Sequence, residues 1–375
     1  MENLKNSILS GLMRVFGLLP IQKKVVISSF WGASYSDNPK FLYEAMKKER
    51  SDYKYVWLLQ NQEFKVDGAR VVKFSSVRAL YHLATASIWI DNVRKRPWVV
   101  KRPQQFYVQT WHGDIPLKKV EKDAEEKLTP LYLQSSKHDS QMANLFLSGA
   151  KWRTKNFRNS FWYDGEILEM GSPKSDIFYG DTVTIREKAR TFFKISDDEK
   201  ILLYAPTFRS DGKIDCYDMK YDDVLKALQN SWGGKWKILL RLHPNIQFLQ
   251  NSITYNEHVL NASAYPDMNE LIVASDVLVT DYSSSMFDGL EANKIVFLYA
   301  SDIEKYAQDR GFYFDICKLP FPLATNTAEF TGLLETFDAE KYKQSTNAFK
   351  EKLGFLNGEN HSLMIARYIF DKVQK

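Results

Sequence analysis

The chain has 375 residues, more than a single ordinary core holds and about the length of two domains of roughly 150–200 residues each. Hydrophobic residues make up 44% and charged residues 26%, which is the composition of a globular protein. The formal net charge of +5 is only mildly basic. It argues against a dedicated nucleic-acid-binding protein and suits anionic substrates or an anionic membrane surface.

The sequence lacks the marks of several common protein classes. No run of about eighteen apolar residues occurs, so we expect no segment that spans a bilayer. Neither GxGxxG nor GxxxxGKS/T occurs, which argues against a typical dinucleotide-dependent enzyme and a P-loop kinase. The two cysteines, Cys216 and Cys317, form no CxxC pattern, and a reducing, cytoplasmic compartment is the simplest inference.

Residues 1–22 predict an amphipathic helix that associates with a membrane surface. Arg14 falls on the face opposite the apolar residues, Lys5 lies near the edge of the apolar stripe, and Lys23 and Lys24 follow. Because Arg14 interrupts the apolar run, a signal peptide is disfavoured. The alternative is a helix that packs on its own domain. The apolar positions with helical spacing are Leu4, Ile8, Leu12, Val15, Phe16 and Leu19.

Short apolar strands alternate with helical segments along the first half of the chain, a pattern that predicts parallel α/β architecture. The predicted strands are 25–30, 55–59, 71–74, 87–91 and 106–110, with helices over 39–49 and 76–86.

The second half repeats this scheme. Strands are predicted at 201–207, 236–243, 276–281 and 295–299, with helices near 221–230, 268–275, 283–292 and 361–375. A boundary is expected near Gly171-Ser172-Pro173. We therefore predict paired Rossmann-like domains with parallel sheets that face a central cleft. The expected ranges are an amphipathic segment at 1–22, domains at 23–175 and 176–357, and a C-terminal helix at 358–375.

His112 lies in QTWHGDIPLKK, just after the predicted strand 106–110. Ligands of open α/β sheets bind at the carboxyl ends of the strands, so this histidine stands where a site is expected. Gly113 lets the backbone turn sharply or approach a ligand, and Lys118 and Lys119 add positive charge one short loop away. This setting suits a base near phosphates, and a structural role is the alternative.

His243 ends the segment WKILLRLHP, with Arg241 two residues before it. Because side chains alternate along a strand, Arg241 and His243 are expected on one face. The position at a strand end favours a functional site, and a capped strand end is the alternative.

The segment DVLVTDYSSSMFDGLEANK joins a strand that ends at Asp281 to a helix that opens on three serines. The free N–H groups and positive dipole end of a helix start form a ready anion site. Ser283, Ser284 and Ser285 can add hydroxyl donors to a pyrophosphate. Helix capping is the alternative, and it explains one serine and not three.

Three further segments are less specific. Arg209 follows the predicted strand 201–207, where a guanidinium can bind phosphate through two nitrogens. Arg310 lies beside aromatic residues in RGFYFD. The loop WGASYSDNPK either hydrogen-bonds polyol hydroxyls or caps its helix, and both interpretations stay open. Its polar residues are Ser34, Ser36, Asp37 and Asn38.

Together these segments resemble the CDP-glycerol glycerophosphotransferase family, the teichoic-acid primases and polymerases. The matching segments run in order from about residue 24 to 340: SYSDNPK, QTWHG with the following LKK, GSPKSDIF, YAPTFR, RLHP, TDYSSSMFD and RGFYFD. The resemblance implies a two-domain GT-B fold at the cytoplasmic face of the cell membrane. It also implies His112 and His243 as candidate catalytic residues, and a donor-phosphate role for Asp281, Tyr282, Ser283 and Ser284.

Two positions depart from the family pattern. Asp114 stands where the family commonly has Thr after WHG, a change that bears on acceptor contacts. Lys174 stands where the family has Arg, which keeps the charge and loses bidentate geometry. The chain also lacks the extra N-terminal region of the long polymerases. Primase-like, polymerase and ribitol-specific roles therefore stay open.

The reaction implied by the resemblance is a displacement at phosphorus, in which an acceptor hydroxyl attacks CDP-glycerol or CDP-ribitol and CMP leaves. His112, in the acceptor-side first domain, is expected to act as the general base. The second domain is expected to hold the donor phosphates through His243, Arg209, Arg241 and the serine loop. Catalysis is expected to rest mostly on positioning and charge neutralisation. No cofactor is expected; no DxD or carboxylate cluster compels a metal, and Mg²⁺ stays compatible.

The expected partners are the CDP-alditol, a lipid-linked teichoic-acid or capsule-type acceptor and the anionic membrane surface. One alternative is a GT-B glycosyltransferase that uses a nucleotide sugar, because a fold does not fix a function. A more distant alternative is a non-catalytic membrane scaffold.

Overall fold

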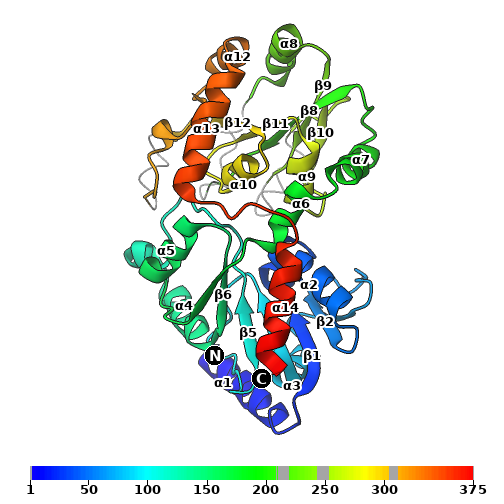
Figure 1. Cartoon of the computed structure of the whole chain (residues 1–375), viewed down its shortest axis with the longest axis vertical. Coiled ribbons are helices and arrows are strands. Elements are labelled where there is room, and N and C mark those ends of the chain that lie inside the picture. The colour runs from blue at the N-terminus through cyan, green and yellow to red at the C-terminus, as the bar shows by residue number, and fades with distance from the viewer. Residues whose placement is uncertain (1, 208, 210–218, 243–252, 304–310, 375) are drawn as a thin grey trace. The chain divides into compact units, whose positions relative to one another are not determined.

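The computed structural model describes residues 2–207, 209, 219–242, 253–303 and 311–374. Its internal contacts divide the chain into two compact units (Figure 1). The first comprises Met1–Asp114, Val120–Asp176 and Phe355–Lys375, and the second comprises Ile115–Lys119 and Ile177–Gly354. The five residues after Asp114 thus belong with the second unit, whereas the C-terminal helix belongs with the first.

The first unit is built on a seven-stranded sheet in the order β3-β2-β1-β4-β5-β6-β7. All of its pairings are parallel, so the carboxyl ends of the neighbours β1, β4 and β5 lie along one edge. The strands are β1 Gln22–Ile27, β2 Lys54–Leu59, β3 Arg70–Lys73, β4 Ala86–Asp91, β5 Phe106–Gln109, β6 Leu145–Ser148 and β7 Glu166–Glu169.

Helices cover both faces of this sheet, because side chains alternate along each strand. On one face, Val25 and Ile27 pack in a core with residues of α2 and α14. On the other face, Val26 packs in a core with residues of α1 and α3. The helices α2 and α14 lie side by side although their sequences are far apart (Figure 1). The helices are α1 Glu2–Phe16, α2 Asp37–Glu49, α3 Val77–Thr85, α4 Pro130–Met142, α5 Lys151–Ser160 and α14 His361–Gln374.

The second unit has a parallel sheet in which the six strands order as β10-β9-β8-β11-β12-β13. Leu202, Leu240 and Val279 face a core that includes residues of α8 and α12. The strands are β8 Glu199–Ala205, β9 Lys235–Leu240, β10 Val259–Asn261, β11 Val277–Thr280, β12 Ile295–Tyr299 and β13 Leu323–Ala324.

The helix that follows β11 packs very closely against the sheet. A Cβ atom at Gly289 of α10 would lie 2.8 Å from a methyl group of Leu278 and 2.9 Å from one of Val296, so any larger residue would force these side chains to move. The described helices of this unit are α6 Asp176–Tyr179, α7 Thr182–Phe193, α8 Tyr221–Trp232, α9 Met268–Ala274, α10 Ser285–Glu291, α12 Thr327–Glu335 and α13 Ala339–Leu353.

Every strand and helix predicted from the sequence is present, with shifted ends. The predicted strand 25–30 ends at Ile27, and the chain then turns through a 3-10 helix at Phe30–Gly32. The predicted strand 236–243 is described as Lys235–Leu240, so Arg241 follows the strand, and His243 lies outside the described residues. The described α-helices and strands that the sequence pattern did not predict are α4, α5, α6, α7, α12, α13, β6, β7, β10 and β13.

The N-terminal helix α1 packs on its own unit and also keeps an exposed apolar row. Met13 is buried, and Leu9, Leu12 and Phe16 pack against the core beneath α3. None of the helices in the described part of the chain combines the length and apolarity needed to cross a membrane. The exposed apolar residues in and after this helix are Leu4, Ile8, Val15, Leu18 and Leu19.

Candidate active site

His112 lies where the sequence predicts it, three residues beyond the end of β5. Its Nδ1 atom is 2.7 Å from the backbone oxygen of Asn92, which follows the neighbouring strand β4. Because a carbonyl oxygen only accepts hydrogen bonds, Nδ1 carries the proton and Nε2 keeps its lone pair. The His112 ring stacks on Trp111 with the ring centroids 4.7 Å apart, and it forms an edge-type pair with Phe30 at a centroid distance of 5.6 Å.

The surroundings of His112 keep its imidazole uncharged. Burial is the main cause that lowers its pKa from 6.5 to about 4. The positive charges of Arg153, Lys174 and Arg94 lower the pKa further, and the hydrogen bond to Asn92 offsets only part of the shift. At neutral pH the ring is therefore a proton acceptor.

The loops around His112 carry strained backbone. Phe30, Trp31, Asp37 and Trp111 have φ angles of 48°, 55°, 61° and 55°, in the region that non-glycine residues avoid. The left-handed residue of the QTWHG turn is Trp111 and not Gly113. Such strain persists only where surrounding contacts enforce it, and it is often found at functional sites.

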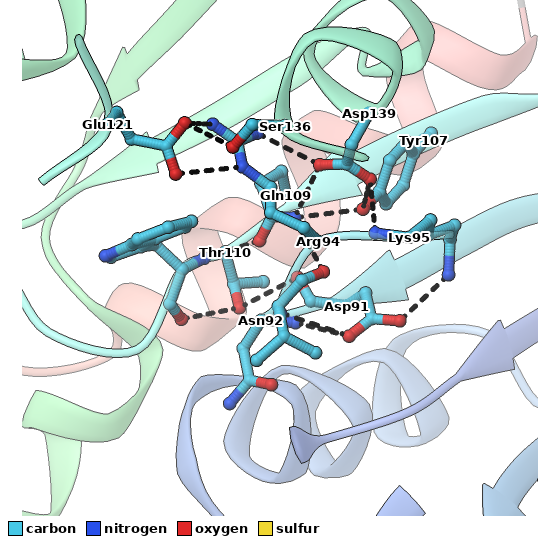
Figure 2. Close-up of polar contacts among 12 residues, drawn as sticks. Asp91, Asn92, Arg94, Lys95, Tyr107, Gln109, Thr110, Glu121, Ser136 and Asp139 are labelled. Atoms are coloured by element: carbon cyan, nitrogen blue, oxygen red, sulfur yellow. Dashed lines mark hydrogen bonds and ion pairs between the residues drawn. The ribbon is translucent and has the colours of Figure 1, made fainter. Parts of the chain in front are cut away.

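A buried polar network enforces the turn (Figure 2). The Gln109 amide donates to Asp139 at 3.2 Å, and its oxygen accepts from the Trp111 backbone at 3.0 Å. Arg94 lies between two carboxylates, with nitrogens 3.0 Å from Asp139 and 2.9 Å from Glu121. All three charged side chains are almost fully buried.

These charges are held by mutual pairing. Burial alone lowers the pKa of Arg94, but the carboxylates of Glu121 and Asp139 outweigh that effect and raise the pKa. Glu121 also accepts hydrogen bonds from Tyr132 and Ser136. The network therefore stabilises the His112 turn. Its own charged groups are already paired with one another and do not serve as a charge for a ligand.

The polar loop after β1 divides into two parts. Asn38 reaches the His112 turn: its amide donates to the Trp111 oxygen at 3.2 Å and accepts from the Lys174 backbone at 3.0 Å. Asp37 accepts from the backbone of Asn38. Ser34 and Ser36 share a hydrogen bond, and Ser36 makes no capping bond at the start of α2. Simple capping by Ser36 thus does not account for this loop.

Asp114 is buried and ties three strand ends together. Its carboxylate accepts from the Gly149 backbone at 2.8 Å and from the Ser172 hydroxyl at 2.5 Å. Gly149 follows β6, and a Cβ atom there would lie 2.6 Å from this carboxylate. The Asp that replaces the family's Thr therefore has internal partners in this structure.

In the second unit, Asp281 gathers the ends of β8 and β11. Its carboxylate accepts from the Thr207 backbone at 2.9 Å, from the Thr207 hydroxyl at 2.6 Å and from the Tyr282 backbone at 2.7 Å. Arg209 lies 2.9 Å from the same carboxylate and also binds Asp302 through two nitrogens, at 2.7 and 3.0 Å. In this structure the Arg209 guanidinium is thus engaged by carboxylates at a position where the sequence predicted phosphate.

The serine loop follows Asp281 and Tyr282 directly. Ser283 and Ser284 are partly exposed, whereas Ser285 is buried as the first residue of α10. Ser283 accepts hydrogen bonds from the backbone and the hydroxyl of Ser285, and Ser284 makes no side-chain capping bond. The hydroxyl of Ser284 therefore lies at the start of the helix without making a capping hydrogen bond.

Arg241 lies at the end of β9, next to β8. One of its nitrogens donates to the backbone oxygens of Tyr265 and Ala262, at 2.6 and 3.3 Å. Burial lowers the pKa of Arg241, although the guanidinium stays charged at neutral pH. His243 and Arg310, both predicted site residues, lie outside the described residues.

Lys118 and Lys119 belong to the second unit, although they follow His112 by only a few residues. Lys118 pairs with Phe312 in a short antiparallel bridge, and the Lys119 backbone donates to Gly311 at 3.1 Å. Phe312 stacks on Tyr282 at 6.0 Å. Residues 118–119 and 311–312 thus contact each other within the unit that carries the serine loop.

Sequence reasoning missed two residues that organise these sites. Asn92 follows the predicted strand 87–91, and Asp302 follows the predicted strand 295–299. The strand-end rule that identified His112 points to both positions. Among the described residues, no three His, Cys, Asp or Glu side chains gather as a metal site.

Two parallel sheets with polar residues at their strand ends define a GT-B-like protein. The chain belongs to the CDP-Glycerol:Poly(glycerophosphate) glycerophosphotransferase family, whose sequence profile matches residues 12–371. This family membership confirms the prediction that the motifs supported.

Three known proteins illustrate the similarity. The teichoic acid poly(glycerol phosphate) polymerase of Staphylococcus epidermidis is 33% identical over 94% of this chain, and the match covers 50% of that protein. The teichoic acid glycerol-phosphate transferase of Staphylococcus aureus is 32% identical, and the match covers 95% of each chain. A solved structure of a variant of the wall teichoic acid polymerase TagF soaked with CDPG is 30% identical, with a TM-score of 0.83 over 100% of this chain and 95% of that chain. The chain thus spans half the length of the first relative and nearly all of the second.

Proposed function

We propose that this protein transfers glycerol phosphate from CDP-glycerol to a hydroxyl of a teichoic-acid-type acceptor and releases CMP. The observation that carries the proposal is His112, an uncharged imidazole whose Nδ1 is engaged and whose Nε2 holds a lone pair at a strand end. Family membership supports a CDP-alditol as donor. The two named bacterial relatives carry glycerol phosphate in their names, which favours glycerol over ribitol.

The proposed chemistry is one displacement at phosphorus. The acceptor oxygen forms a bond to the β-phosphorus of CDP-glycerol while the bond from that phosphorus to the bridging oxygen breaks. CMP leaves with the bridging oxygen, and the acceptor proton passes to Nε2 of His112. The low pKa of His112 means that the base is ready at neutral pH and releases the proton easily afterwards.

The donor phosphates are assigned to the second unit. Ser283 and Ser284 precede the first turn of α10, where backbone N–H groups favour an anion. We assign Arg209 and Asp281 the task of ordering this loop, because their charged groups already bind each other. Arg241, Lys118 and Lys119 supply positive charge, and His243 keeps the donor role that the sequence motif predicts.

The protein is further proposed to lie on the cytoplasmic face of the cell membrane as a peripheral protein. The support is α1, whose exposed apolar residues Leu4, Ile8 and Val15 recur on one side of the helix. Arg14 and Lys5 are exposed beside them and suit anionic lipid headgroups. A lipid-linked acceptor would be held by that same membrane.

The decisive experiment supplies the protein with CDP-glycerol, CDP-ribitol or UDP-glucose together with a lipid-linked glycerol phosphate acceptor. Mass spectrometry should show acceptor extended by one or more glycerol phosphate units, with release of CMP. Extension from CDP-ribitol alone would show that the alditol transferred is ribitol and not glycerol. Transfer of glucose alone would establish the nucleotide-sugar glycosyltransferase instead.

A further inference from the structure

Among the residues that the structure describes, Asn92 makes the only polar contact with the His112 ring. Its backbone oxygen accepts the hydrogen bond from Nδ1 of His112 at 2.7 Å. The hydrogen on Nδ1 is what leaves the opposite nitrogen, Nε2, free to accept a proton. The position of one carbonyl group therefore decides which nitrogen of His112 is basic.

That carbonyl is fixed by the side chain of the same residue. The Asn92 amide oxygen accepts from the Phe30 backbone at 2.8 Å, and the amide nitrogen donates to the Ser29 hydroxyl at 3.2 Å. The Asn92 backbone N–H donates to Asp91 at 2.9 Å. Asn92 is fully buried, so water offers no substitute for these partners.

The same side chain also places a second neighbour of His112. Phe30, whose backbone N–H the amide oxygen holds, packs against the imidazole in an edge-type arrangement, with the two ring centroids 5.6 Å apart. Phe30 has a φ of 48°, a conformation that needs such a restraint. One buried amide thus sets both the carbonyl that accepts from the ring and the aromatic side chain beside it.

We propose that Asn92 is a positioning residue, which holds His112 as the Nδ1–H tautomer with Nε2 directed to the acceptor hydroxyl. This inference rests on the proposed role of His112 as general base. Asn92 itself touches no reacting atom. An amide is required at this position because it must accept from a backbone N–H and donate to a hydroxyl at once.

The test compares Asn92→Ala with a matched control, Asn144→Ala. Asn144 also accepts from a backbone N–H of the same sheet, that of Tyr107 at 2.9 Å, but has no contact with His112 among the described residues. Two-bond ¹H–¹⁵N NMR spectra report the tautomer of each histidine. The signal of His112 is identified as the one that disappears in the His112→Gln variant. Wild type and N144A should show the Nδ1–H form, whereas N92A should show a mixture.

Turnover gives the second readout. N92A should lower kcat by about 10²-fold, the loss expected when a catalytic group is displaced by about an ångström. Its KM for CDP-glycerol should stay within about twofold, because the base acts in the transition state. Asn92→Asp keeps the acceptor for the Phe30 backbone N–H and loses only the donor to Ser29, so it should retain more of the Nδ1–H tautomer and of the activity than N92A.

Several results would overturn the proposal. One is an Nε2–H tautomer in the wild type; another is N92A with wild-type tautomer and kcat; a third is equal loss of kcat in N92A and N92D without any tautomer change. A wild-type protein that transfers no glycerol phosphate, but whose His112 changes tautomer in N92A, would refute the proposed function and leave the positioning role of Asn92 standing.

Discussion

The carboxylate of Asp281 accepts three hydrogen bonds from Thr207. The Thr207 backbone N–H donates to both carboxylate oxygens, and the Thr207 hydroxyl donates to one of them at 2.6 Å. The two residues follow the neighbouring strands β11 and β8. Asp281 also binds Arg209, and both side chains are buried.

Replacing the carboxylate of Asp281 should lower the stability of the fold. Asp281→Ala removes the carboxylate that accepts from Thr207 and Tyr282 and pairs with the buried Arg209, so the free energy of unfolding should fall by about 3 kcal/mol or more. Asp281→Asn retains one acceptor and should lose less. Urea denaturation measures both. Asp198→Ala breaks an exposed ion pair with Lys235 and serves as the control, with little change expected. Equal effects at the two aspartates would contradict this assignment.

Mild acid should destabilise the fold through two histidines. Burial is the main cause that lowers the pKa of both His82 and His112 from 6.5 to about 4. Between those two pH values the unfolded chain binds protons that the folded chain does not, so stability falls as pH drops through this window. Above pH 6.5 neither histidine contributes to the dependence.

The measurement is urea unfolding at pH 7 and pH 5. His82→Gln should reduce the difference between the two pH values, because the replacement does not titrate. His258→Gln is the control at an exposed position and should leave the difference as in wild type. A His82 variant with an unchanged pH difference would show that His82 titrates normally in the folded protein.

His112→Ala should remove the general base and lower kcat by about 10²–10⁴-fold. Donor affinity should hardly change, because a base that acts in the transition state contributes little to ground-state binding. His138→Ala is a suitable control, since His138 is also partly buried in the first unit and binds the Val99 backbone at 2.7 Å. Calorimetric titration with CDP-glycerol beside turnover measurements gives both quantities.

For His243, which lies outside the described residues, the sequence motif predicts a role in donor binding as well as in turnover. His243→Ala should weaken CDP-glycerol binding as well as turnover. If His112→Ala lost donor binding while His243→Ala kept it, the two roles would be exchanged.

The fold was accessible from the sequence because parallel strands buried on both faces appear as short apolar runs, as in VVI and KILL. The elements that escaped prediction have weaker patterns. The helix α4 reads PLYLQSSKHDSQM, and its buried face is largely polar: Ser136 and Asp139 bind Glu121 and Arg94. A helix that buries a charge network shows no apolar stripe.

The site was predictable in part for a similar reason. His112 stands out as a rare residue at a strand end, but its partner is a backbone oxygen, and a sequence does not show where a carbonyl points. Arg209 and Asp281 were expected at the donor phosphates, whereas in the structure they bind each other. Their pairing depends on β8 and β11 being neighbours in the sheet, which only the topology reveals.

The last prediction concerns the membrane. If the exposed apolar row of α1 enters the lipid interface, Ile8→Asp or Val15→Asp should weaken binding to vesicles that contain anionic lipid, because each places a charge where an apolar side chain would be buried. The fold should remain intact, since both side chains are more than half exposed. High salt should weaken wild-type binding as well, through Lys5 and Arg14.

Val183→Asp in α7 is the matched control: Val183 is 65% exposed, close to the 60% of Val15, but lies in the second unit. Vesicle co-sedimentation measures all four proteins. Binding by V15D as strong as that of V183D would show that α1 serves only to pack on its own unit.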